Sequence, residues 1–259
     1  MIEEPYRWVE AVANRREYIE TQLASGSPIA AVSCRDGILF LTRGRVRQKL
    51  FEIYDRIAMG GIGHPGDIER LRMAAIELAS TEGFTRSAAD VSLRRLAFYS
   101  LSPVLKAAFE QVYGAPYLAR MLFAEIGDTP ASDLFLRVEY DGAIATSGGA
   151  LGDAPRGFGV VSGTSPSSEL MEAFLNKEHD PAATLQQAFS RASDAWIVGT
   201  MALGEAGIRE LPDAEAIAAY RRYHGDSNAL EAALLERSSR TAIRYRSLAP
   251  DEVSSLSAR

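Results

Sequence analysis

The chain has 259 residues, of which 47% are hydrophobic, and this apolar content is sufficient for one large core. Its formal net charge is -6, with 28 basic and 34 acidic residues spread along the chain, so we expect no nucleic acid partner. Cys34 is the single cysteine, which excludes an intramolecular disulfide and, in an apolar strand, predicts a small buried side chain.

Neither a membrane segment nor a metal site is expected. No stretch approaches the ~18 apolar residues that a membrane span needs, and the first residues lack the basic and apolar regions of a secretory signal. His64, His179 and His224 are far apart, and each lies in a turn-like context that predicts a surface position. We therefore expect a cytoplasmic protein that binds no membrane, no metal and no other cofactor.

The N-terminal part of the chain predicts a helix followed by four strands. Between residues 6 and 24, apolar residues recur at three- and four-residue steps, and charged residues fill the opposite face. A hairpin follows, because Asp36-Gly37 tolerates the positive φ angles of a tight turn. The four strands are expected at Ile29–Val32, Ile38–Leu41, Lys49–Tyr54 and Ile57–Ile62.

The middle of the chain predicts two helices and then three strands. The first helix covers about residues 66–82, and the second runs from about Ala89 to Tyr113. Pro103 should kink or break the second helix, since proline cannot donate a backbone hydrogen bond. The strands are expected at Tyr117–Ile126, Leu134–Tyr140 and Gly157–Ser162.

The C-terminal part predicts two more helices and a final pair of strands. One helix covers Ser167–Asn176, and the next begins at Asp180-Pro181, an N-cap followed by proline, and ends near Trp196. Residues 205–223 form an acidic, helix-prone segment that we interpret as an insertion. The last strands are expected at Asn228–Glu236 and Thr241–Ser247, before a short helix.

The order of these elements predicts the fold class. Strands, two helices, strands, two helices and strands are best accommodated by two antiparallel sheets stacked face to face, with helices over each outer face. We therefore predict an α+β fold, a four-layer αββα sandwich. Residues 1–259 are expected to form one domain, with residues 1–25 as an N-terminal helix.

Short motifs at ordered spacings add a family resemblance. Glu17-Tyr18 resembles the pair in the N-terminal helix of proteasome α-type subunits, and Gly26-Ser27 resembles the start of their first strand. Lys49 stands where that family has a strand lysine. The other matching motifs are Asp36-Gly37, Gly61, Gly63 and Tyr140-Asp141-Gly142. The resemblance covers about residues 5–200, resumes near 228, and is greatest to bacterial α subunits.

The resemblance implies a fold, an assembly and a function. The family has the fold of the N-terminal-nucleophile hydrolases and forms a ring of seven identical α subunits stacked on proteasome β subunits. Such a ring templates the β ring, gates the entry of unfolded protein substrates and docks a ring-shaped AAA ATPase. Lys49 and Gly26 would belong to the pocket that receives the activator. The gate and the ring contact would involve Pro5, Tyr6, Glu17 and Tyr18.

Ser27 raises the question of catalysis. Active β subunits use an N-terminal threonine as nucleophile, and Ser27 stands at that place in this chain. However, Thr42-Arg43-Gly44-Arg45 is basic where active subunits carry an acidic residue, so we expect no carboxylate near Lys49 and no catalysis. Two alternatives stay open: a peptidase that cleaves itself at Gly26-Ser27, and a proteasome-like ring that serves only as a scaffold.

Overall fold

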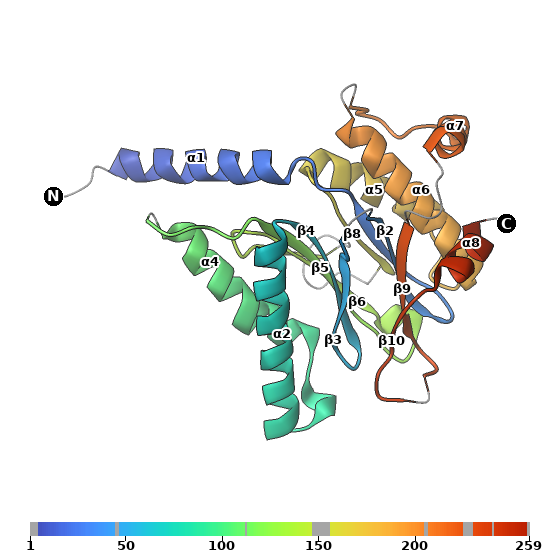
Figure 1. The fold of residues 1–259 in the computed structure, drawn as a ribbon, viewed down its shortest axis with the longest axis horizontal. Helices are drawn as coiled ribbons and strands as arrows, with labels where there is room; N and C mark the ends of the chain where they lie inside the picture. The colour runs from blue at the N-terminus through green and yellow to red at the C-terminus, as the bar shows by residue number, and fades with distance from the viewer. Residues whose placement is uncertain are drawn as a thin grey trace.

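Two stacked antiparallel sheets form the centre of the protein. The computed structural model describes residues 5–44, 47–111, 113–146, 156–204, 207–224, 230–239 and 241–257, without the side chains of residues 5–7 and 224. Within these ranges each sheet has five strands, and helices cover both outer faces (Figure 1). The structure is thus the α+β four-layer sandwich that the sequence predicts.

The first sheet has the strand order β10-β9-β2-β1-β8, and all its neighbouring strands are antiparallel. Its central hairpin turns at Gly37, whose φ is 155°, and a Cβ there would lie 1.8 Å from the carbonyl oxygen of Leu235. Only glycine fits this turn. The strands are β1 (Ile29–Ser33), β2 (Gly37–Arg43), β8 (Phe158–Val161), β9 (Leu230–Glu236) and β10 (Tyr245–Ser247).

The second sheet has the order β3-β4-β5-β6-β7, also antiparallel. Strand β3 therefore lies at an edge, and its register with β4 shifts between Glu52 and Tyr54. This edge position matters for the site described below. The strands are β3 (Leu50–Tyr54), β4 (Ile57–Gly63), β5 (Ala119–Glu125), β6 (Leu134–Val138) and β7 (Ile144–Ala145).

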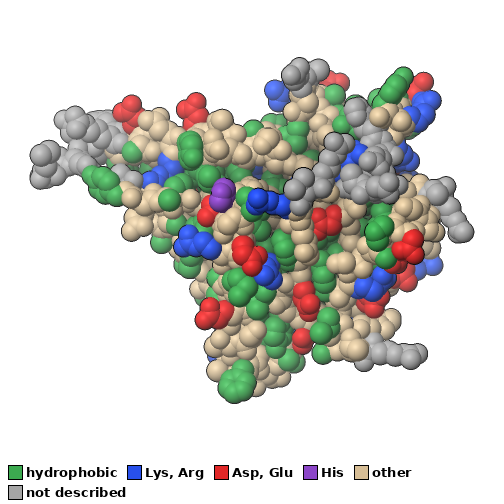
Figure 2. Space-filling view, viewed as in Figure 1, with side chains coloured by type: hydrophobic (Ala, Val, Ile, Leu, Met, Phe, Trp, Pro, Cys, Tyr) green, Lys and Arg blue, Asp and Glu red, His purple; other side chains and the backbone are tan. Residues whose placement is uncertain are grey.

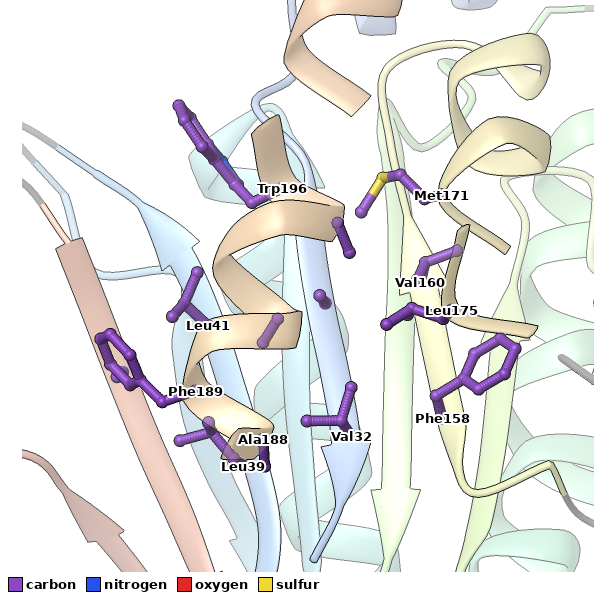
Figure 3. Close-up of a cluster of buried hydrophobic side chains, with 14 of the residues drawn as sticks. Val32, Leu39, Leu41, Phe158, Val160, Met171, Leu175, Ala188, Phe189 and Trp196 are labelled. Atoms are coloured by element: carbon purple, nitrogen blue, oxygen red, sulfur yellow. The ribbon is translucent and has the colours of Figure 1, made fainter. Parts of the chain in front are cut away.

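Side chains of the first sheet point alternately toward the second sheet and toward the outer helices, and both layers are apolar. Ile29 and Ala31 of β1 face the second sheet, whereas Ala30 and Val32 face the helices. Successive side chains of a strand point to opposite faces, so a strand buried on both sides is apolar throughout. Figure 3 shows the outer layer, where side chains of the first sheet meet those of α5 (Ser165–Glu178) and α6 (Leu185–Leu203).

The helices over the second sheet are more broken than predicted. The helix α2 (Pro65–Thr85) is continuous, but the expected helix Ala89–Tyr113 is divided. It consists of a 3₁₀ turn at Ala88–Asp90, a short α3 (Leu93–Arg95), a π-helical stretch Leu96–Leu101 and α4 (Ser102–Glu110). Pro103 is the second residue of α4, just after the π-helical stretch, as expected for a residue without a backbone N–H. Val112 lies outside the described residues.

The predicted start of α6 is wrong. Asp180 closes a turn instead, because its Oδ1 accepts the N–H of Ala182 at 2.8 Å. The helix begins four residues later, at Leu185, with Thr184 and Gln187 capping each other's backbone N–H groups. It continues beyond Trp196 to Leu203. A reciprocal capping pair satisfies two free N–H groups and therefore defines the helix start better than proline.

The expected surface position is also wrong for His179, whose ring nitrogens are buried. Its ring lies edge-on to Phe158, with centroids 6.3 Å apart. His64 is exposed, as predicted, and the side chain of His224 lies outside the described residues. Cys34 is fully buried, as predicted.

The helix α1 (Pro5–Leu23) contacts the sandwich mainly with its C-terminal half, and Val12 is a partly buried residue of the same contact. Ile19 and Leu23 are buried and pack with Phe109 and Tyr140. Trp8 is 43% exposed, and Val9 is 67% exposed. In Figure 1 the N-terminal half extends beyond the sandwich. Trp8 is therefore not part of the buried cluster that Ile19 and Leu23 form in the described residues.

Two helices complete the layer over the first sheet. The helix α7 (Ala214–His224) buries Ile217 in the apolar cluster of α6, and Arg221 forms an ion pair with Asp194. The helix α8 (Pro250–Ser257) buries Val253 in the same cluster. No helix within the described residues is long and apolar enough to cross a lipid bilayer.

Candidate functional site

A cavity of ≈ 530 Å³ lies where α1 ends and where β3 and α2 begin. Its wall combines the turn after α1 with glycines of β4 and apolar side chains of β4 and α2. The residues that bear on the argument are Gly26, Ser27, Lys49, Gly61, Ile62 and Ile68. The structure therefore brings Gly26 and Lys49, the two residues predicted for an activator pocket, into one cavity.

The backbone carbonyl and the backbone N–H of Lys49 are both hydrogen-bonded. Its carbonyl accepts the N–H of Gly61 at 3.1 Å, and its own N–H donates to the carboxylate of Glu231 at 3.0 Å. The side-chain Nζ donates to the carbonyl of Arg43 at 3.4 Å. Burial lowers the pKa of the ammonium, and the charge of Glu231 partly offsets this effect.

Glu231 corrects the expectation that no carboxylate lies near Lys49. It stands at the start of β9, 182 residues after Lys49, and also accepts the N–H of Leu50 at 2.9 Å. Burial raises the pKa of Glu231, while the two backbone N–H groups act in the opposite direction. The sequence carried one signal: a single acidic residue near the start of an apolar strand.

The hydroxyl of Ser27 has two partners. It donates to the carbonyl of Arg43 at 3.2 Å and accepts the indole N–H of Trp196 at 3.3 Å. Trp196 is 7% exposed, so it packs in the core. The guanidinium of Arg43 lies 5.6 Å from the centre of the Trp196 ring. Arg45, part of the same sequence argument, lies outside the described residues.

Gly26 closes the turn that follows α1 at the cavity. Its N–H donates to the carbonyl of Leu23 at 2.8 Å, and a Cβ on Gly26 would lie 2.9 Å from that oxygen. A larger residue would shift the turn that separates α1 from Ser27.

The mouth of the cavity carries charges of both signs. Arg47 and Glu69 line it, and Glu69 is paired with Arg72 at 2.7 Å. Arg72 also lies 5.4 Å from the centre of the Phe51 ring. Figure 2 shows acidic and basic side chains interspersed on this face of the molecule. The mouth of the cavity is therefore not uniformly basic. The side chain of Lys49, which also lines the cavity, is half-buried.

The residues predicted for the gate and the ring contact lie elsewhere. Glu17 and Tyr18 are exposed on α1, and the side chains of Pro5 and Tyr6 lie outside the described residues. About 25 Å of helix separates the start of α1 from the cavity, at 1.5 Å per residue. In the described ranges no three His, Cys, Asp or Glu side chains are arranged to bind a metal ion.

The chain is similar in sequence to several known proteins that share one name. The chain is 31% identical to the proteasome subunit alpha of Parafrankia sp. over 204 residues, which are 78% of this chain and 79% of the relative. It is 31% identical to that of Frankia casuarinae over 192 residues, covering 73% and 75%. For Nocardioides sp. the identity is 31% over 181 residues, covering 69% and 66%.

No protein-family model matches the chain. The stacked sheets with helices on both outer faces nevertheless define a sandwich of the proteasome-subunit class. The chain belongs to the family of bacterial proteasome α subunits.

Proposed function

We propose that the chain is a non-catalytic subunit of a seven-membered α ring, stacked on a ring of β subunits that degrade proteins. The names of the relatives support a part in the proteasome. In this proposal the α ring templates the β ring, gates the entry of unfolded proteins and docks a ring-shaped AAA ATPase in the cytoplasm. We also treat residues 1–259 as one domain, with 205–223 as an outer insertion.

The cavity around Lys49 carries this proposal. A half-buried ammonium can receive the terminal carboxylate of a partner's tail in a charge-assisted hydrogen bond. The apolar wall formed by Phe51, Ile62 and Ile68 suits the aliphatic or aromatic side chain just before that carboxylate. Each contact is modest, but several tails on one ring gain from a high effective concentration.

The test uses the chain assembled with its β partner. Lys49→Ala should leave ring assembly and the cleavage of short peptides intact, and it should abolish stimulation by the partner ATPase. Lys106→Ala is the matched control, because Lys106 is an exposed lysine of α4. Equal stimulation of wild type and Lys49→Ala would refute tail docking at this cavity.

Gating is proposed for residues 2–7, which include the predicted gate residues Pro5 and Tyr6 at the start of α1. If they narrow the entrance, deletion of residues 2–7 should speed the degradation of an unstructured protein more than the cleavage of a tripeptide. The location of α1 supports this, since its N-terminal half extends away from the sandwich (Figure 1). Equal rates before and after deletion would argue against a gate.

The competing function is a peptidase that cleaves itself before Ser27. Glu231 removes one argument against it, because a carboxylate does lie close to the backbone of Lys49. Two other observations favour the non-catalytic role. The Ser27 hydroxyl is already engaged by Trp196 and Arg43, and α1 is packed into the sandwich directly before it.

A further inference from the structure

The contact between Glu231 and β3 joins the two sheets at the cavity. Because β3 is an edge strand, no strand of the described residues pairs with the N–H groups on its outer side. Glu231 of β9, in the opposite sheet, accepts the N–H of Lys49 through both oxygens, each at 3.0 Å, and that of Leu50 at 2.9 Å. At the start of β3 the carboxylate of Glu231 therefore supplies the hydrogen-bond acceptors that a neighbouring strand would otherwise provide.

This contact determines where Lys49 stands. With Gly61 bonded to its carbonyl and Glu231 to its N–H, the lysine backbone is fixed between β4 and β9. By contrast, the Nζ has one long hydrogen bond within the described part of the chain, at 3.4 Å, to the carbonyl of Arg43. Among the described residues the ion pairs of lysines involve Lys106 and Lys177, and Nζ of Lys49 forms none. The backbone is thus held firmly, and the ammonium keeps donors for a ligand.

The charges around Lys49 come from several elements. Glu231 is the acidic group whose charge acts on Lys49. The other charged or titratable groups at the cavity or beside Glu231 are Arg43 of β2, Arg47 before β3, Glu69 of α2 and Tyr245 of β10. Because Glu69 is paired with Arg72, its charge is largely balanced.

We propose that Glu231 is the positioning residue of the Lys49 site: it fixes the backbone by accepting the N–H groups of Lys49 and Leu50, and it serves as the counter-charge of the lysine. An incoming carboxylate then meets a cation that is already partly balanced, so Glu231 limits the affinity for an anionic tail. The inference rests on the proposed tail-docking function, and it assigns to Glu231 a role in tuning that function.

Two substitutions of Glu231 separate its role in holding the backbone from its role as a counter-charge. Glu231→Gln keeps an oxygen that can accept both N–H groups but removes the charge. Glu231→Ala removes both. Glu236→Gln is the control, since Glu236 lies at the other end of β9 and pairs with Arg246. The probe is acetyl-Gly-Phe-Ala with a free carboxylate, compared with its C-terminal amide, on the α ring assembled with its β partner.

We expect Glu231→Gln to bind the probe on the order of tenfold more tightly than wild type at neutral pH, because the like charge is gone. As the pH is raised, Glu231→Gln should also lose the probe at a lower pH than wild type does, because Lys49 gives up its proton more readily without the charge of Glu231. Glu231→Ala should bind on the order of tenfold more weakly than Glu231→Gln, because Lys49 is no longer held in place. The control should match wild type.

Failure of this inference can be distinguished from failure of the proposed function. If Lys49→Met binds the probe as wild type does, tail docking at Lys49 is wrong. Amide exchange then still tests the positioning role, because Glu231→Ala should accelerate exchange at Lys49 and Leu50 and leave Phe123 unchanged. Unchanged amide exchange in Glu231→Ala, or an unchanged alkaline limit in Glu231→Gln, would overturn the inference.

Discussion

Arg120 of β5 and Glu20 of α1 form an ion pair with a nitrogen–oxygen distance of 2.8 Å, although they are 100 residues apart in the sequence. The guanidinium of Arg120 is almost fully buried and also binds Glu139 and the carbonyls of Ser162 and Gly163. Tyr140 donates to the same Glu20 carboxylate at 2.7 Å. This network anchors α1 to the second sheet and sets the direction in which the helix leaves the sandwich.

We predict that Arg120→Met lowers the free energy of unfolding by about 3 kcal/mol, because it leaves buried acceptors and a carboxylate without their cation. The matched control is Lys106→Met, whose exposed pair with Glu110 should contribute less than about 1 kcal/mol. Urea denaturation of both variants measures the difference. Similar losses for both would show that the network adds no special stability.

We predict that polar substitutions in the exposed half of α1 impair ring assembly. Trp8 and Val9 are apolar and exposed, whereas Ile19 and Leu23 are already buried within the chain. The double variant Trp8→Ser with Val9→Asp should therefore fold with unchanged stability but fail to form rings, as measured by native mass spectrometry. Tyr223→Ser, an exposed aromatic residue of α7, is the control. Intact rings in the double variant would show that this half of α1 makes no essential contact.

Ser27 predicts a chain that does not process itself. The purified protein should hydrolyse no peptide without a β partner, and its intact mass should include residues 1–26. Ser27→Ala should cost about 1 kcal/mol of stability, since Trp196 then loses its hydrogen-bond acceptor. Peptide turnover that disappears in Ser27→Ala, or a mass that lacks residues 1–26, would favour the peptidase.

His179 predicts a loss of stability in acid. Burial lowers the pKa of its imidazole in the folded protein, so below about pH 6.5 the unfolded chain binds a proton that the folded chain resists. Stability that is fully present above that pH should decrease as the pH falls toward the folded pKa. His179→Phe should show a smaller decrease between pH 7.5 and pH 5.5, whereas the exposed His64→Gln should behave as wild type. Parallel pH profiles for wild type and His179→Phe would exclude this role.

Local patterns in the sequence were sufficient for the fold class and for most elements. Period-two and period-3.6 apolar patterns depend on nearest neighbours along the chain, so β1 to β4 and α2 were predicted within a few residues. The start of α6 was missed because two local signals competed, and the Thr184–Gln187 pair prevailed over Asp180-Pro181. Asp180 instead forms a turn with Ala182.

By itself the sequence determined the α+β sandwich, the place of Gly26 and Lys49 in the chain, and the resemblance to proteasome α subunits. Only the tertiary structure placed Glu231 against Lys49, and Trp196 against Ser27. These pairs are 182 and 169 residues apart, and no local periodicity relates them. They meet because two sheets and a helix layer converge at one end of the sandwich, where the packing of the whole chain decides which side chains come into contact.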